Sequence, residues 1–137
     1  MLLIRHGSAG DRTAWDGDDR ARPLDERGLR QAASFVELLT PYEIERILSS
    51  PAVRCVQTVE SLAAARGLAI EVREELAEEL QSTLGAELVR SLAGGDAVVC
   101  GHGGLEQVLR EPPRWQKGAV LVVDGRLDVL GKLRPAV

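Results

Sequence analysis

The sequence has few of the residues that would mark it as secreted, membrane-spanning or nucleic-acid-binding. Its two cysteines, Cys55 and Cys100, are too few for a disulfide framework and are not spaced as a CxxC pair. No apolar run approaches the length of a membrane span. The formal net charge of −4 argues against a nucleic-acid partner, which usually requires a basic face. We therefore expect no membrane and no nucleic-acid partner, and two reduced cysteines in the core.

Aromatic residues are also scarce, at 3% of the chain, so the core must be built from Leu, Val, Ile and Ala. Apolar residues make up 45% of the sequence, and 137 residues are most simply one domain covering 1–137. The N-terminal residues 1–5 are too short for the apolar segment of a signal peptide, and we expect a cytoplasmic location. The sequence does not indicate an oligomeric state.

Short apolar runs alternate with longer segments of helical period, a pattern typical of layered α/β proteins. Continuous apolar runs at 2–4 and 97–100 predict two buried strands, and the segments 44–48 and 68–72 are also predicted to be strands. Two further runs flank Asp124-Gly125, a strong hairpin signal. The expected fold is a three-layer α/β/α sandwich with a mostly parallel central sheet and a C-terminal antiparallel hairpin.

Three longer helices and a short one at 105–110 are predicted between the strands. Asp25 is a good N-cap for the first, with Leu29 on its apolar face. Ser50 as N-cap and Pro51 at the first helical position begin the second. Leucines at helical spacing over 84–92 mark the third.

The chain has only two histidines, and both occupy the same sequence context. His6 follows the first predicted strand and His102 follows the fourth, each directly before a glycine. Ligands of open α/β sheets bind outside the carboxyl ends of the strands, so the two side chains meet if their strands are neighbours. A lone histidine is more often a surface or satisfied core residue, but two in one context favour a shared site.

Two arginines are placed to bind an anion beside these histidines. Arg5 precedes His6, and Arg54 lies in the first turn of the helix predicted from Ser50. Helix N-termini favour anions, and the guanidinium group matches the oxygens of phosphate. Most of the 17 Lys and Arg residues must be solvated surface charges, although Arg20 and Arg22 could add positive potential.

Four segments resemble, in order, the motifs of one family. They are LIRHG at 3–7, RPL at 22–24 followed by Gly28, Gln31 and Ala32, SSPAVRCVQT at 49–58, and VVCGHGG at 98–104. They are similar to the motifs of the histidine phosphatase superfamily, also called phosphoglycerate mutase-like. In length the chain most resembles the SixA-type phosphohistidine phosphatases.

The resemblance implies a role for each matching residue. His6 would attack phosphorus and carry the phosphoryl group, which water then removes. Arg5, Arg54 and His102 would surround the phosphate, with the N–H of Gly103 within reach. Nearby arginines should lower the pKa of His6, leaving a ring nitrogen with a free lone pair. No metal and no cofactor are implied, because the arginines neutralise the charge.

The general acid that an alcohol leaving group requires is less clearly indicated. Residues 76–78, Leu-Ala-Glu, resemble a family context in which a carboxylate donates the proton, so Glu78 is the candidate. However, Glu74, Glu75 and Glu79 stand beside it, and a run of carboxylates is usually a solvated face. The identity of the acid among these four stays open.

The expected function is a phosphatase that works through a phosphohistidine intermediate and acts on phosphohistidine in a protein. The short chain leaves no room for a lid, and an imidazole leaving group depends little on an acid. The alternatives are a phosphatase of small phosphomonoesters or nucleotides and a non-catalytic phosphate-binding module; a mutase is less expected. Residues 22–24 and 55–58 also resemble the phosphatase domain appended to some MutT-type Nudix hydrolases, which leaves a Nudix-type partner open.

Overall fold

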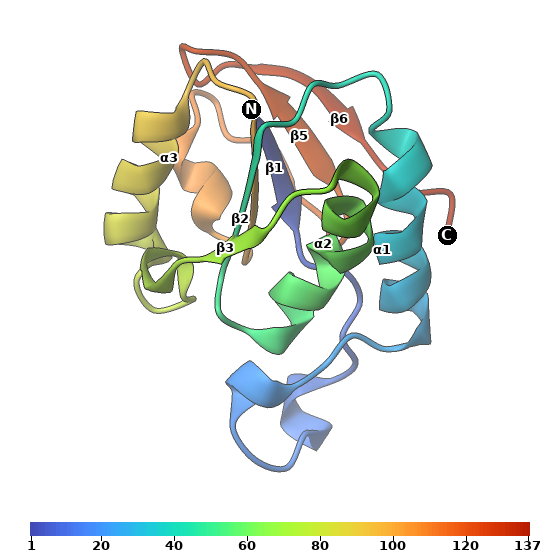
Figure 1. Ribbon diagram of the computed structural model, residues 1–137. Helices are drawn as coiled ribbons and strands as arrows, with labels where there is room; N and C mark the ends of the chain where they lie inside the picture. Colours follow the sequence, from blue (N-terminus) through green and yellow to red (C-terminus); the bar gives the residue numbers. More distant parts are fainter.

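The computed structural model describes all 137 residues, and its centre is a six-stranded sheet (Figure 1). The strands are β1 (Leu2–Arg5), β2 (Arg46–Ser49), β3 (Ile70–Val72), β4 (Ala97–Gly101), β5 (Val120–Val123) and β6 (Val129–Leu133). Their order is β3-β2-β4-β1-β5-β6. The first four run parallel, whereas β5 is antiparallel to both β1 and β6. The expected mixed sheet with a C-terminal hairpin is confirmed.

Helices cover both faces of the sheet. On one face lie α1 (Glu26–Leu38) and α2 (Val53–Arg66), and on the other lie α3 (Ala86–Leu92) and a 3₁₀ helix at Leu105–Val108 (Figure 1). Successive strand residues point to opposite faces, so Ile4 enters the core under α1 and α2 while Leu3 enters the other core. The three-layer sandwich is therefore confirmed. None of the helices combines the length and apolar character needed to cross a bilayer.

The register of β1 and β4 brings the two histidine-bearing strand ends together. Arg5 is paired with Gly101, and the His6 N–H donates to the Gly101 carbonyl at 3.1 Å. His6 and His102 therefore leave the same edge of the sheet side by side.

The segment from residue 8 to residue 22 extends beyond the carboxyl end of β1 (Figure 1). It contains two short 3₁₀ helices, Arg12–Ala14 and Asp19–Ala21. Each begins after an aspartate, Asp11 or Asp18, whose carboxylate accepts a hydrogen bond from a backbone N–H. This predicted loop thus has local order of its own and lies over the histidine edge of the sheet.

Asp25 caps α1 as predicted, accepting from the Gly28 N–H at 2.8 Å. The predicted apolar face, however, was wrong by one position, because Leu29 is 50% exposed while Gly28 is buried. The cause is a close approach of backbones. A Cβ on Gly28 would lie 2.0 Å from the Ser8 carbonyl oxygen, so α1 packs through this glycine against the chain that follows His6.

The second helix begins later than predicted. Ala52, with extended backbone angles, is the N-cap of α2, and Ser50 lies outside the helix. The Ser50 Oγ accepts from the Ala52 N–H at 3.2 Å and lies 2.8 Å from His102 Nε2. The side chain predicted to cap the helix instead contacts a histidine of the site.

The third helix also differs from its prediction. It starts as a π-helical turn, Gln81–Gly85, before continuing as α3. Gly85 and Val89 face the core, whereas Leu84, on the predicted apolar face, is exposed.

In the C-terminal hairpin, the loop is longer than the predicted Asp124-Gly125 turn, and Leu127 takes the left-handed conformation. Cys55 and Cys100 are free and buried, as expected.

Candidate active site

The two histidines lie against each other at the carboxyl edge of β1 and β4. Their ring centroids are 5.6 Å apart with the planes inclined at 65°. His6 is 4% exposed and His102 is 1% exposed, so both rings are removed from bulk water. The structure therefore makes the contact that the sequence argument required.

The hydrogen bonding of His6 fixes which nitrogen can react. Its Nδ1 lies 2.8 Å from the Gly7 carbonyl oxygen, which can only accept, so the proton resides on Nδ1. Burial lowers the pKa of His6 from 6.5 to about 3, and the charges of Arg54, His102 and Arg5 act in the same direction against the Gly7 carbonyl. His6 is consequently neutral near pH 7, with a lone pair on Nε2.

Side chains from both helices hold the chain that carries His6. The Gly7 N–H donates to Thr58 Oγ1 at 3.0 Å, and the Thr58 hydroxyl in turn donates to the Arg54 carbonyl at 2.6 Å. Gln31 of α1 accepts from the Ser8 N–H at 2.8 Å. The glutamine and threonine positions of the motifs thus keep the His6 backbone in place.

His102 is held from both sides of its ring and from its backbone. Nε2 contacts Ser50 Oγ, and Nδ1 lies 3.4 Å from an Arg54 nitrogen. The Gln81 side-chain amide accepts from the His102 N–H at 3.1 Å and donates to the Gly103 carbonyl at 3.0 Å. Gln81 was missed by the sequence argument, because its position in a π turn follows from no helical period.

The two predicted arginines both reach the site. Arg54 is 1% exposed and donates to the backbone carbonyl of Asp19 at 2.8 Å and to its carboxylate at 3.0 Å. Arg5 donates to the Trp115 carbonyl at 2.7 Å and packs on Gly103. The Nε atoms of both arginines are buried without a hydrogen-bond acceptor.

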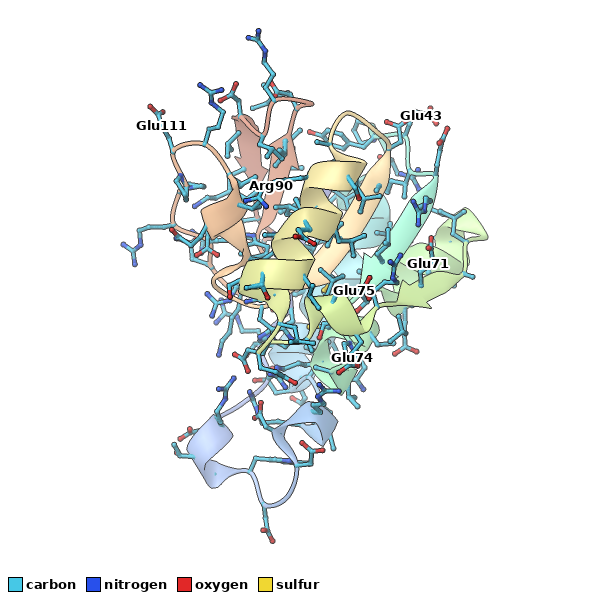
Figure 2. All side chains as sticks on the ribbon, turned by 90° about the vertical axis from the view of Figure 1, so that its left-hand side faces the viewer. Glu43, Glu71, Glu74, Glu75, Arg90 and Glu111 are labelled. Carbon is cyan, nitrogen blue, oxygen red and sulfur yellow. The ribbon has the colours of Figure 1, made fainter.

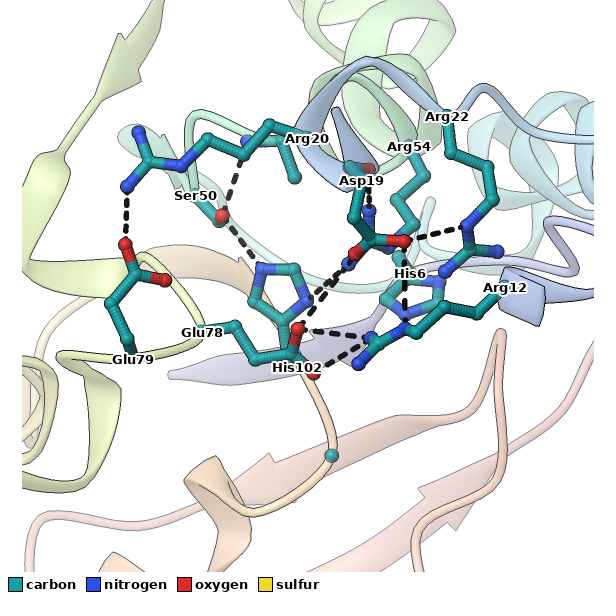
Figure 3. Close-up of polar contacts among 12 residues, drawn as sticks. His6, Arg12, Asp19, Arg20, Arg22, Ser50, Arg54, Glu78, Glu79 and His102 are labelled. Atoms are coloured by element: carbon teal, nitrogen blue, oxygen red, sulfur yellow. Dashed lines mark hydrogen bonds and ion pairs between the residues drawn. The ribbon is translucent and has the colours of Figure 1, made fainter. Parts of the chain in front are cut away.

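Two cavities flank these side chains, and Arg12 and Glu78 line both (Figure 3). One, of about 250 Å³, has no hydrophobic lining residue; its walls are Arg5, His6, Gly10, Arg12, Arg22, Glu78, Gly103 and Lys117. The other, of about 330 Å³, contains His102 and Arg54. All six predicted site residues therefore border one or the other of these two adjoining polar cavities, which together form one depression.

Asp19, which the sequence argument did not single out, lies among three arginines (Figure 3). Its carboxylate is 3.0 Å from Arg54, 3.0 Å from Arg22 and 3.4 Å from Arg12. Burial raises its pKa, but the Arg22 hydrogen bond and the charges of Arg54 and Arg12 outweigh this and hold it below the usual value. Asp19 thus balances cations that would otherwise repel one another.

Among the four candidate acids only Glu78 borders the cavity that contains His6. Both of its oxygens accept from Arg12, at 2.9 and 3.0 Å, and one lies 3.6 Å from Arg54. Glu74 and Glu79 instead pair with Arg20. Glu75 pairs with Arg73. Figure 2 shows Glu74 and Glu75 on the segment that follows β3.

Comparison with known proteins identifies the family of the chain. The family model described as the histidine phosphatase superfamily (branch 1) matches residues 1–80, more than half of the chain. The chain belongs to the histidine phosphatase superfamily. As a histidine phosphatase it is an enzyme of the hydrolase class.

A curated relative and two solved structures resemble this histidine phosphatase. The 8-oxo-(d)GTP phosphatase of Mycolicibacterium smegmatis is 36% identical over 108 residues, which cover 75% of this chain and 34% of the relative. The chain thus spans about a third of the length of that relative. A protein assigned as phosphohistidine phosphatase SixA of Agrobacterium tumefaciens is 25% identical, with a TM-score of 0.79 over 98% of this chain and 96% of that chain.

The protein histidine phosphatase SixA in complex with tungstate has the same fold, with a TM-score of 0.76 at 24% identity over 97% of this chain and 95% of that chain. The near-complete coverage in both directions shows that this histidine phosphatase has the size and architecture of the SixA proteins. The fold expected from the motifs is therefore confirmed along the whole chain.

Three charged residues of the depression were missed by the sequence argument, namely Arg12, Asp19 and Lys117. Arg12 and Asp19 lie in the polar loop after His6, where charged residues are common and have no periodic pattern. Lys117 lies two residues after Trp115, whose side chain is buried. For Lys117, the only signal in the sequence was its position just before a buried strand, opposite the end of β1.

No three His, Cys, Asp or Glu side chains gather in a group that could hold a metal ion.

Proposed function

We propose that His6 is the nucleophile of this phosphatase and that its Nε2 takes the phosphoryl group from the substrate. The observation that carries the proposal is the hydrogen bond from Nδ1 to the Gly7 carbonyl, which leaves Nε2 unprotonated beside His102. The P–O or P–N bond to the leaving group breaks as the P–Nε2 bond forms. Water then attacks the phosphohistidine, releasing inorganic phosphate and restoring neutral His6.

Charge neutralisation in this mechanism comes from the protein itself. Arg5, Arg54 and His102 would surround the transferred phosphoryl group, together with the Gly103 N–H. The unpaired Nε donors of the two arginines support this role, because a buried donor without an acceptor costs about 1–3 kcal/mol and phosphate oxygens supply acceptors. Phosphoryl transfer needs positioning and charge stabilisation more than other chemistry, so we infer that no metal is required.

Glu78 is the proposed general acid, supported by its place on the wall of the His6 cavity. Its two hydrogen bonds from Arg12 must loosen before one oxygen can carry a proton to the leaving group. Glu78→Gln should therefore slow hydrolysis of alkyl phosphates about a hundredfold or more, while p-nitrophenyl phosphate, whose leaving group needs no proton, is much less affected. Equal losses on both substrates would remove Glu78 from the mechanism.

Phosphohistidine in a protein is the substrate we infer first. The SixA likeness over nearly the whole chain supports it, and so does the open depression, which would admit a side chain presented by another protein. A small phosphorylated compound is the second candidate. The 36% identity to an 8-oxo-(d)GTP phosphatase favours a nucleotide in that case, and leaves open a Nudix-type partner.

The function is tested by steady-state hydrolysis with the wild type and His6→Ala. The panel contains p-nitrophenyl phosphate, a phosphohistidine peptide, nucleoside phosphates and sugar phosphates. We expect His6→Ala to lose about a thousandfold or more on every substrate that the wild type hydrolyses. Hydrolysis that persists in His6→Ala would overturn the proposed nucleophile, and the ranking of the panel decides between the two substrate candidates.

A further inference from the structure

A third cavity, lined by basic residues, adjoins the cavity that contains His6. It has a volume of about 450 Å³ and shares Arg5 and Lys117 with the first. Arg27, in the first turn of α1, and Arg134, after β6, form its outer part. Four of its seven lining residues are basic and none is acidic, although the chain as a whole carries a net charge of −4.

The cations of this cavity have no carboxylate partners. Arg27, Lys117 and Arg134 form no ion pair, in contrast with Arg46 and Arg73, which each pair with a glutamate. Other arginines of the chain, such as Arg30 and Arg66, also form no ion pair, so what distinguishes this cavity is that it gathers four basic residues with no acidic one. A pocket of unpaired cations next to a phosphate site therefore calls for an anion from outside the protein.

The surroundings of Lys117 show the same imbalance. Burial lowers the pKa of Lys117, and the positive charges of Arg5, Arg22 and Arg12 lower it further, while Asp25 opposes them. The carboxylate of Asp25 does not compensate for these cations, and it is already engaged by the Ser8 hydroxyl and two backbone N–H groups. A bound anion would remove this repulsion.

We propose that Arg27, Lys117 and Arg134 form a second anion subsite, which binds a further phosphate group of a substrate whose terminal phosphoryl group reaches His6. The inference rests on the proposed function of His6. Such a subsite would select compounds with two or more linked phosphates, such as nucleoside di- and triphosphates. Phosphohistidine carries only one phosphoryl group and would leave the subsite empty. The inference therefore concerns the second substrate candidate of the proposed function, the small phosphorylated compound.

The chemistry of such a substrate suits the site. His6 Nε2 attacks the terminal phosphorus, and the bond from that phosphorus to the bridging oxygen breaks. The bridging oxygen leaves as a terminal oxygen of the shortened phosphate chain, and water then releases inorganic phosphate from His6. A phosphate leaving group is a much weaker base than an alkoxide, so this reaction requires little from Glu78, whose oxygens are held by Arg12.

The test uses the double variant Arg27→Gln/Arg134→Gln, with Arg30→Gln as a matched control. Arg30 is an exposed arginine of the same helix and lines neither cavity. We expect kcat/KM for GTP and ADP to fall about tenfold or more in the double variant, mainly through KM, because each arginine provides a charge-assisted contact to phosphate. Hydrolysis of p-nitrophenyl phosphate and of a phosphohistidine peptide should stay within about twofold of the wild type.

A binding measurement separates the subsite from catalysis. In a His6→Asn background, calorimetry should show that inorganic pyrophosphate binds more tightly than inorganic phosphate, and that the double substitution removes this preference while Arg30→Gln keeps it. Equal affinities for the two anions would overturn the subsite even if His6 is the nucleophile. A loss of phosphohistidine peptide hydrolysis in the double variant, equal to its loss on GTP and ADP, would also overturn the subsite. Arg27 and Arg134 would then contact a protein substrate instead of a second phosphate.

Discussion

Gly103 shows, at the scale of a single residue, how closely the groups that we propose to bind phosphate are packed. A Cβ at this position would lie 2.9 Å from Arg5 Cζ and 3.0 Å from one of its terminal nitrogens. Gly103→Ala should displace the guanidinium by a few tenths of an ångström and lower kcat/KM for p-nitrophenyl phosphate about tenfold, because small misplacements of charged groups cost catalysis heavily. Kinetics combined with thermal unfolding would check this.

Gly131→Ala is the matched control, since a Cβ there meets no atom within 4 Å. Both variants should keep the stability of the wild type, and only Gly103→Ala should lose activity. Full activity in Gly103→Ala would show that the position of Arg5 does not matter for phosphate binding.

The same scale shows what the sequence could predict about the site. His6, His102, Arg5 and Arg54 could be predicted because they stand at strand ends or in a helix start, where the chain direction is known. Asp19 could not, since its contacts with three arginines depend on the path of the loop after β1, which no periodicity encodes. The roles of the predicted residues stay predictions until the experiments above are done.

At the scale of elements, the contact of α1 with the chain after β1 positions His6. A glycine-to-alanine change inside a helix ordinarily stabilises by up to about 1 kcal/mol. Gly28→Ala should do the reverse, because the new Cβ would lie 2.0 Å from the Ser8 carbonyl oxygen, and backbone must move. We expect a loss of about 3 kcal/mol in the free energy of unfolding, measured by urea denaturation, with a loss of activity. Stability equal to or above that of the wild type would show that α1 does not press on this segment.

The strands and helices themselves were largely predictable, while their boundaries were not. Apolar runs located β1 and β4 to within one residue, since both are buried on both faces. The start of α2 was misplaced because Ser50, a good N-cap in isolation, contacts His102 instead. The π turn before α3 was missed because Gln81 is held by the backbone of residues 102 and 103, a tertiary contact with no local signal.

At the scale of the whole molecule, burying a neutral histidine couples folding to pH. The pKa of His6 is about 3 in the folded protein and near 6.5 when unfolded, so below pH 6.5 the unfolded chain binds a proton that the native state does not. This contribution to stability is present above pH 6.5 and is lost as the pH falls from there toward 3. Between about pH 7.5 and about pH 5 it should lower the free energy of unfolding by about 2 kcal/mol.

Urea denaturation of the wild type and of His6→Asn at both pH values isolates this effect, because the other titrating groups are common to the two proteins. We expect the wild type to lose about 2 kcal/mol more than the variant over this range. The same loss in both would mean that His6 takes up its proton in the folded protein as readily as in the unfolded chain.

The central claim, that His6 Nε2 carries the phosphoryl group, is tested most directly by trapping the intermediate. The enzyme is mixed with p-nitrophenyl phosphate, quenched within milliseconds in alkaline denaturant, and analysed by intact and peptide mass spectrometry. The account predicts one added phosphoryl group per chain, located on His6 and missing in His6→Ala. A phosphoryl group on His102 or on any other residue, or turnover with no phosphorylated enzyme at any quench time, would contradict it.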